Sequence, residues 1–254
     1  MRSCPILIAF AITTLTLHAQ LTPLTRAIRL EDFAEARKHI TPELVNTPDQ
    51  GQYHPLTYAA YTGNNGLIVA LLKAGADPNV VEQNGKTALY VAANLANGEG
   101  IKLLHQHGAK LPPKTARSPG VAAVHSSSVE CLKALVKSYP DIDLGRGWEQ
   151  CTRENLGWSL LGDPVSYAAY HGYEDIALFL LRQGVRPTGK DLLGKGALHH
   201  AAFNRSCSVE LVRELLKRGS SAVEVARPIL NKYRYGTSYR PDTPLELAAI
   251  TGNL

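Results

Sequence analysis

A seven-residue phrase recurs along the chain and limits its possible folds more than any other feature. Clear copies are His-Pro-Leu-Thr-Tyr-Ala-Ala at residues 54–60 and Asp-Pro-Val-Ser-Tyr-Ala-Ala at residues 163–169. Further copies lie at residues 87–93, 196–202 and 243–249, and weaker ones at Ala122-Ala123 and Thr22-Pro23-Leu24. The alanine pairs are 33 residues apart from Ala59 to Ala92, and again from Ala168 to Ala201. Such a period is typical of repeat proteins, in which stacked units share a core that none can form alone.

The residues of each copy predict a pair of helices. Proline suits the first helical position, and the Thr or Asp that often precedes it can cap the free amides. The small alanine pair lets neighbouring helices approach closely, and a following glycine permits a tight reversal into the second helix. Leucines of the second helix then fill the layer between units. We therefore predict that Leu71, Leu104 and Leu180 are core residues.

A 33-residue unit headed by Thr-Pro-Leu-His-x-Ala resembles the ankyrin repeat. The resemblance covers about residues 22–254 and implies an all-α solenoid of stacked helix-turn-helix units with β-hairpin-like turns. It also implies a function in protein–protein recognition. We expect units near residues 22–50, 54–86, 87–116, 117–144, 163–195 and 196–222, and an incomplete unit at 243–254.

Two wider spacings between alanine pairs indicate insertions, near residues 144–162 and 223–241. The first contains Trp148, Arg153 and Trp158, and the second contains Tyr233, Arg234, Tyr235 and Tyr239. Aromatic and arginine side chains are enriched among binding hot spots, so these residues are candidate partner contacts. The alternative is that they cover their own loops. The Lys-Tyr-Arg-Tyr stretch could also bind nucleic acid, because its cations attract phosphates and its rings can stack on bases. Since the chain is expected to be exported, we expect no nucleic-acid partner.

The position directly after each alanine pair is a second candidate surface. It is occupied by Tyr61, Asn94, Val124, Tyr170, Phe203 and Ile250. In the ankyrin family this part of the first helix borders the concave groove, so large residues there indicate a partner-binding stripe formed chiefly by Tyr61, Tyr170 and Phe203. Packing between adjacent first helices is the alternative.

The first residues show the pattern of a secretory signal peptide. Arg2 supplies a positive start, residues 5–17 are uncharged and largely apolar, and Ala19 is a small residue suited to cleavage. We expect removal of residues 1–19 during export to the periplasm or extracellular space, leaving a repeat domain at 20–254. A buried N-terminal helix or an uncleaved anchor is the alternative.

Cleavage would leave three cysteines, Cys131, Cys151 and Cys207. An odd number in an exported protein leaves at least one thiol unpaired or intermolecular. A bridge between Cys131 and Cys151 is one possibility that the sequence leaves undetermined.

Catalytic and cofactor signatures are absent from the sequence. A composition of 44% hydrophobic and 19% charged residues excludes a disordered chain, and no apolar run reaches the roughly 18 residues of a membrane span. Neither the pair His105 and His107 nor the pair His199 and His200 has a metal-ligand pattern. His199 occupies the repeat's own histidine position, where a structural hydrogen bond is the usual role. We expect no cofactor, no metal and no enzymatic activity.

The main hypothesis is an exported module that binds another protein, of unknown identity, through its concave face and enlarged loops. One alternative is an enzyme or enzyme-associated fragment whose missing C-terminal part carries the chemistry, and another is a cytosolic scaffold. The last copy ends at Leu254, directly after its first helix. Three interpretations of this end remain: the chain is a fragment, a partner covers the last repeat, or two copies associate through the uncapped repeat.

Overall fold

The computed structural model describes residues 21–148, 162–191, 194–204, 207–222 and 243–251. Regular structure within these ranges is entirely helical, with no strand. The predicted all-α class is confirmed. The described residues form two compact units. The first runs up to Pro119 and includes Ala134–Pro140, whereas the second combines Gly120–Lys133 with the described residues from Asp141 onward. The pair α8 (Pro119–His125) and α9 (Val129–Ser138) contributes residues to both.

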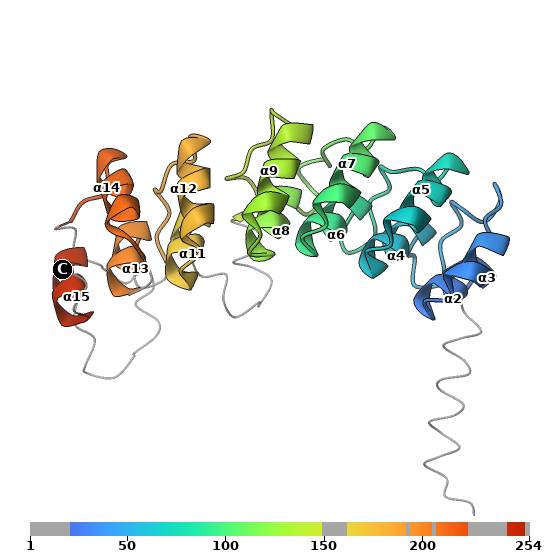
Figure 1. Ribbon diagram of the computed structural model, residues 1–254, viewed down its shortest axis with the longest axis horizontal. Coiled ribbons are helices and arrows are strands. Elements are labelled where there is room, and N and C mark those ends of the chain that lie inside the picture. The colour runs from blue at the N-terminus through green and yellow to red at the C-terminus, as the bar shows by residue number, and fades with distance from the viewer. Residues whose placement is uncertain (1–20, 149–161, 192–193, 205–206, 223–242, 252–254) are drawn as a thin grey trace, which may run out of the picture. The chain divides into compact units, whose positions relative to one another are not determined.

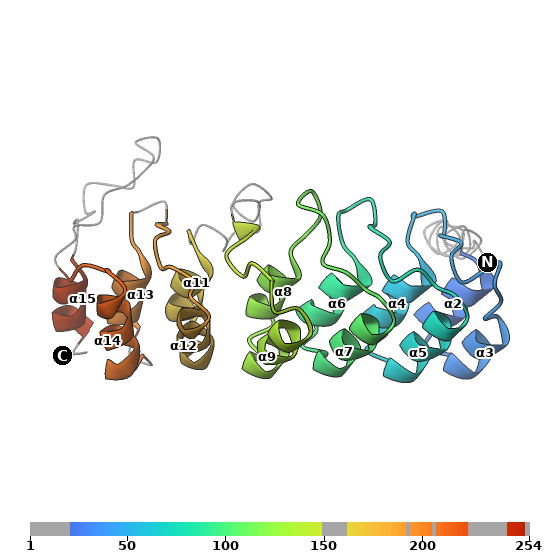
Figure 2. The same cartoon turned by 90° about the horizontal axis from the view of Figure 1, so that it is seen from above.

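Three successive helix pairs build the first unit. They are α2 (Pro23–Arg29) with α3 (Phe33–Lys38), α4 (Pro55–Thr62) with α5 (Asn65–Lys73), and α6 (Ala88–Asn94) with α7 (Gly98–Gln106). Within this unit the pairs lie side by side, with the first helices in one row and the second helices in another (Figures 1 and 2). Helix α4 contacts α2 and α6, and α5 contacts α3 and α7. Each pair therefore buries its apolar side against its neighbours.

The second unit repeats this arrangement. It contains α11 (Pro164–His171) with α12 (Glu174–Arg182), α13 (Ala197–Phe203) with α14 (Val209–Lys217), and the helix α15 (Pro244–Thr251). Helix α13 contacts both α11 and α15, and α12 contacts α14. The close-packed row of first helices follows from the alanine pairs, since Ala168 and Ala169 are fully buried.

The helix starts follow the predicted capping chemistry at most of the repeated phrases. The Thr87 hydroxyl accepts a hydrogen bond from the Tyr90 amide at 3.0 Å, and Asp163 Oδ1 accepts one from the Ser166 amide at 2.8 Å. His54, which precedes α4, makes no such side-chain bond. Its amide instead donates to Glu82 Oε1 at 3.1 Å, so a carboxylate from the next turn replaces the local cap.

The predicted core residues are buried in the structure. The side chains of Leu71, Leu104 and Leu180 have no exposed surface. Gly63 and Gly172 end α4 and α11 in the left-handed region, with φ values of 65° and 73°, as a tight reversal into the second helix requires.

Hairpin-like turns connect successive helix pairs. In the turn before α6, the Glu82 amide donates to the Lys86 carbonyl at 2.8 Å. In the turn before α13, the Asp191 amide donates to the Lys195 carbonyl at 2.9 Å. These local bonds fix the turn tips next to the first helices.

Two asparagines at equivalent positions tie each turn of the first unit to the next. Asn46 Nδ2 donates to the Gly75 carbonyl, and its Oδ1 accepts from the Asp77 amide, both at 2.8 Å. Asn79, one repeat later, bonds the Gly108 carbonyl and the Lys110 amide in the same way, at 3.2 and 2.8 Å. Repeat spacing is thus set by polar bonds as well as by apolar packing.

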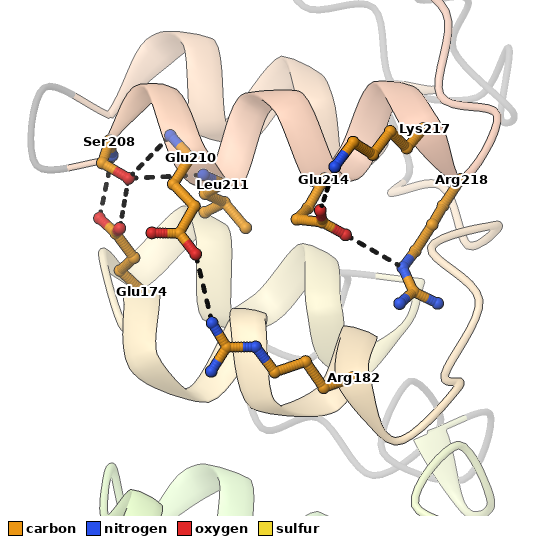
Figure 3. Close-up of polar contacts among 8 residues, drawn as sticks. All are labelled: Glu174, Arg182, Ser208, Glu210, Leu211, Glu214, Lys217 and Arg218. Carbon is orange, nitrogen blue, oxygen red and sulfur yellow. Dashed lines mark hydrogen bonds and ion pairs between the residues drawn. The ribbon is translucent and has the colours of Figure 1, made fainter.

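Polar contacts also join the second helices of the second unit (Figure 3). The Glu174 carboxylate accepts hydrogen bonds from both the amide and the hydroxyl of Ser208, the residue that caps α14. Arg182 reaches Glu210 with an N–O distance of 3.2 Å. The Glu214 carboxylate lies between Lys217 and Arg218 of its own helix turn. The carboxylates drawn in this view are therefore engaged by neighbours of the same unit.

Candidate partner-binding face

Three of the sequence-predicted contact residues are exposed at equivalent places on first helices. Tyr61 of α4 is 40% exposed, Tyr170 of α11 is 39% exposed, and Phe203 of α13 is 57% exposed. We call the exposed positions directly after the alanine pairs the first-helix face. In the first unit it carries Tyr61 and the exposed Asn94, and in the second unit it carries Tyr170 and Phe203.

Tyr61 is oriented by a lysine from the next turn. Lys86 Nζ lies 2.8 Å from the Tyr61 hydroxyl and 5.4 Å from the centre of its ring. The hydroxyl accepts a hydrogen bond from the ammonium group, which lies beyond the hydroxyl end of the ring. The aromatic side chain is thereby held in place at the surface while part of it stays open to solvent.

Tyr170 and Phe203 lie on adjacent helices of the second unit, α11 and α13. The Tyr170 ring meets His171 and His200 edge-on, with ring centres 5.1 and 5.4 Å apart. Asn204, which follows Phe203, donates from Nδ2 to the Tyr170 carbonyl at 2.9 Å. This bond links the end of α13 to the end of α11 and fixes the spacing of the two exposed rings.

Other predicted contact residues are placed differently. Val124 is fully buried, which fits packing rather than the expected stripe. Trp148 is 3% exposed, and its ring packs on Tyr167 of α11 with centres 5.4 Å apart, so it is a core residue and not the exposed contact that was predicted. The side chain of Ile250 and the residues Arg153, Trp158, Tyr233, Arg234, Tyr235 and Tyr239 lie outside the described part of the chain.

A cluster of imidazole and aromatic rings in the second unit was not predicted from the sequence. Tyr167 stacks on His125 at 4.7 Å and meets His171 at 4.3 Å, and Trp148 closes the other side. Tyr167 and His171 flank the recurring alanine pair, and His125 occupies the same position after Ala122-Ala123 that His171 occupies after Ala168-Ala169, so the repeat pattern alone did not mark them. In the sequence, the only sign of this cluster is that several histidine and aromatic residues occur near the insertion at residues 144–162.

Histidine nitrogens in and beside this cluster are buried without hydrogen bonds in the described structure. They are Nε2 of His125, His171 and His200, and Trp148 Nε1 shares this condition. Burial lowers the pKa of His125 and of His171. Burial, followed by the nearby Lys195 charge and by His199, lowers the pKa of His200 to about 3, although Asp191 Oδ2 lies 3.4 Å from its Nε2. These rings are neutral at pH 7.

The buried His200 ring predicts a loss of stability in acid. The unfolded chain protonates this ring below its ordinary pKa of 6.5, whereas the folded chain does so only near pH 3. Between these values the unfolded state holds more protons, so the free energy of unfolding falls as the pH falls, by up to about 1.4 kcal/mol per pH unit. Urea unfolding of wild type and His200→Gln at several pH values measures the effect. The variant should lose stability less steeply below pH 6.5, and equal slopes would contradict the assignment.

Cys151 lies outside the described residues, so a bridge between it and Cys131 stays a prediction. Cys131 lies on α9 with 1% of its surface exposed, and burial raises the pKa of its thiol to about 11. Burial also raises the pKa of the Cys207 thiol to about 11. Neither group is a thiolate at neutral pH.

The described residues offer neither a metal-binding cluster nor a membrane-spanning helix. No group of three or more His, Cys, Asp or Glu side chains there is arranged to hold a metal ion. No described helix is both long and apolar enough to cross a bilayer. His199 Nδ1 accepts a hydrogen bond from the Gly196 amide at 3.3 Å, in line with its expected structural role.

Comparisons with known proteins identify the repeat. Residues 56–146 match the family model for ankyrin repeats, in three copies. The chain is 29% identical to inversin from Mus musculus over 203 residues, which is 79% of this chain and 17% of inversin. It is 26% identical over 214 residues to the human SH3 and multiple ankyrin repeat domains protein 2, covering 81% of this chain and 10% of that protein. The chain thus spans less than a fifth of the length of either relative.

Known structures give the same result for the fold. The human ASB11 ankyrin repeat domain aligns with a TM-score of 0.65 and 23% identity over 90% of this chain and 92% of that domain. The ankyrin repeat domain of Bcl-3 aligns with a TM-score of 0.60 and 20% identity, over 90% and 94% of the two chains. The protein has the ankyrin-repeat fold, and residues 56–146 match the ankyrin-repeat family model.

Proposed function

We propose that this chain is an exported module that binds another protein through its first-helix face and has no catalytic activity of its own. The observation that carries the proposal is the exposure of Tyr61, Tyr170 and Phe203 at equivalent positions of repeats whose other large apolar side chains are mostly buried. Large aromatic side chains supply much contact area for little loss of conformational freedom, and they are frequent hot spots. Ankyrin repeats are protein-interaction modules, which supports the same conclusion.

Export rests on the N-terminal pattern of residues 1–19, which lie outside the described structure. The enlarged loops at residues 144–162 and 223–241 would extend the binding surface. The N-terminus of the mature protein tests export, because the proposal requires Gln20 there and a retained Met1 contradicts it.

Removing the three exposed rings together should weaken partner capture without unfolding the chain. We expect the Tyr61→Ala, Tyr170→Ala, Phe203→Ala triple variant to retain its helical circular dichroism, because these rings are partly solvated. Capture from the exported fraction should fall at least about tenfold, as expected when several hot-spot side chains are truncated.

The matched control is the Val209→Ala, Leu216→Ala double variant. It also truncates exposed apolar side chains, which are 72% and 43% exposed, but both belong to the second helix α14. The control should capture the same proteins as wild type. Unchanged capture by the triple variant, with capture lost in the control, would remove the first-helix face from the proposal.

A further inference from the structure

We propose that the first unit binds an acidic segment of its partner on a strip of tyrosines and cations. The strip consists of Tyr53, Tyr58, Tyr61, Arg29 and Lys86. This inference rests on the proposed protein-binding function and adds the chemical class of the partner. It is carried by the way charges are distributed over the first helices α2, α4 and α6 and the turn tips at residues 47–54 and 80–87.

Contacts within the first unit assemble the strip from three repeats. Arg29 of α2 lies over the Tyr58 ring of α4, 5.8 Å from its centre. The Tyr53 and Tyr58 rings are 5.8 Å apart, and Lys86, from the turn before α6, donates a hydrogen bond to the Tyr61 hydroxyl at 2.8 Å. Tyr58 and Tyr61 are three residues apart on one helix and share its side. The strip therefore combines two cations and three phenol rings from three consecutive repeats.

The carboxylates in this part of the unit are withdrawn from solvent. Asp49 is 5% exposed, and it accepts hydrogen bonds from the Tyr58 hydroxyl at 2.6 Å and from the Tyr53 amide at 2.9 Å. Glu82 is 3% exposed and accepts from the His54 amide, with the His54 ring nitrogen 3.2 Å away. A ligand approaching the strip meets the cations and the phenol hydroxyls, not these acids.

The cations of the strip differ from two lysines of the second helices in the same unit. On α3 and α7, Lys38 and Lys102 are paired with glutamates three residues earlier, at 2.7 and 3.1 Å. Arg29 and Lys86 make no ion pair with any described residue: Arg29 lies over the Tyr58 ring, and Lys86 donates a hydrogen bond to the Tyr61 hydroxyl. Carboxylates of a partner can therefore bind them without displacing an existing ion pair, and electrostatic attraction of this kind mainly speeds association and sets specificity.

A polypeptide fits this surface better than a nucleic acid. Binding of single strands relies on bases stacking on open aromatic faces and on many phosphate contacts. Here the Tyr53 and Tyr58 rings lie against each other with centres 5.8 Å apart, and Arg29 lies over the Tyr58 ring, so these two rings offer little open face to a base. The cations are also few and separated by phenol groups, which suits carboxylates spaced along an extended chain.

Fluorescence anisotropy with the full-length protein tests the inference. The probe is a fluorescein-labelled peptide of about 12 residues that alternates Glu with Leu, and the comparison peptide replaces every Glu by Gln. We expect the Glu peptide to bind at least about tenfold more tightly, with an affinity that weakens as NaCl is raised from about 0.05 to about 0.3 M. The Arg29→Gln, Lys86→Gln variant should lose about tenfold in affinity.

Lys73→Gln, at an exposed lysine of the second helix α5, is the matched control and should bind like wild type. Equal binding of the two peptides, no binding, an equal loss in the control, or tighter binding of a single-stranded oligonucleotide would each overturn the inference. Partner capture by the Tyr61→Ala, Tyr170→Ala, Phe203→Ala variant is measured in a separate experiment. If that variant loses capture while the Glu peptide does not bind, protein binding stands and the acidic partner class is wrong.

Discussion

Leu71→Ala should lower the free energy of unfolding by about 2–5 kcal/mol, because it leaves a cavity between helices that cannot close fully. Leu71 has no exposed surface, and its helix α5 contacts α3, α4 and α7. The lost contacts are therefore shared by three neighbouring repeats. Equilibrium urea unfolding, followed by circular dichroism, measures the change.

The same substitution at Leu216 is the control. This side chain is 43% exposed, so Leu216→Ala leaves no closed cavity and should cost less than about 1 kcal/mol. Similar losses at both positions would mean that Leu71 is not part of a shared core.

Gly189→Ala should destabilise the second unit by about 3 kcal/mol, at the upper end of the cost of overpacking. The backbone of Gly189 crosses that of Gly162 so closely that an added methyl group would overlap the Gly162 carbonyl and lie 2.7 Å from the Asp163 nitrogen. The Gly189 amide also donates to Asp163 Oδ2 at 2.6 Å. Rigid backbone surrounds the site, so the overlap can be relieved only by moving the turn away from α11.

Gly196→Ala tests the same substitution where space exists. A methyl group there would lie 3.5 Å from the Gly189 carbonyl oxygen, an ordinary contact, and the φ of −101° is allowed for alanine. We expect a change below about 1 kcal/mol, mostly from the poorer capping residue. A thermal melt of Gly189→Ala that matches wild type would show that the two backbones do not cross as described.

The fold could be predicted from the sequence because the same pattern of local structure recurs in successive repeats. Proline, alanine pair, glycine and leucine occur at fixed offsets, so one unusual residue does not hide the pattern. Even the weaker copy at Ala122-Ala123 lies on a helix that begins at Pro119, because proline still suits the first helical position.

Contacts between repeats were beyond the reach of the sequence pattern. Nothing near His54 indicates that its amide bonds Glu82, which lies 28 residues later. In the same way, tryptophan is common at binding surfaces, but the ring of Trp148 is buried against Tyr167 and His125. Exposure at Tyr61, Tyr170 and Phe203 was indicated because the repeat period fixes which side of a helix a position occupies.

Site-specific photocrosslinking tests most directly the claim that first helices bind the partner and second helices do not. A photoreactive amino acid is placed singly at Tyr61 and Tyr170 on first helices, and at the exposed Lys73 and Arg213 on second helices. Irradiation in the exported fraction should join a partner protein to the chain from Tyr61 and Tyr170 only. Crosslinks from Lys73 and Arg213, with none from the tyrosine positions, would contradict the account.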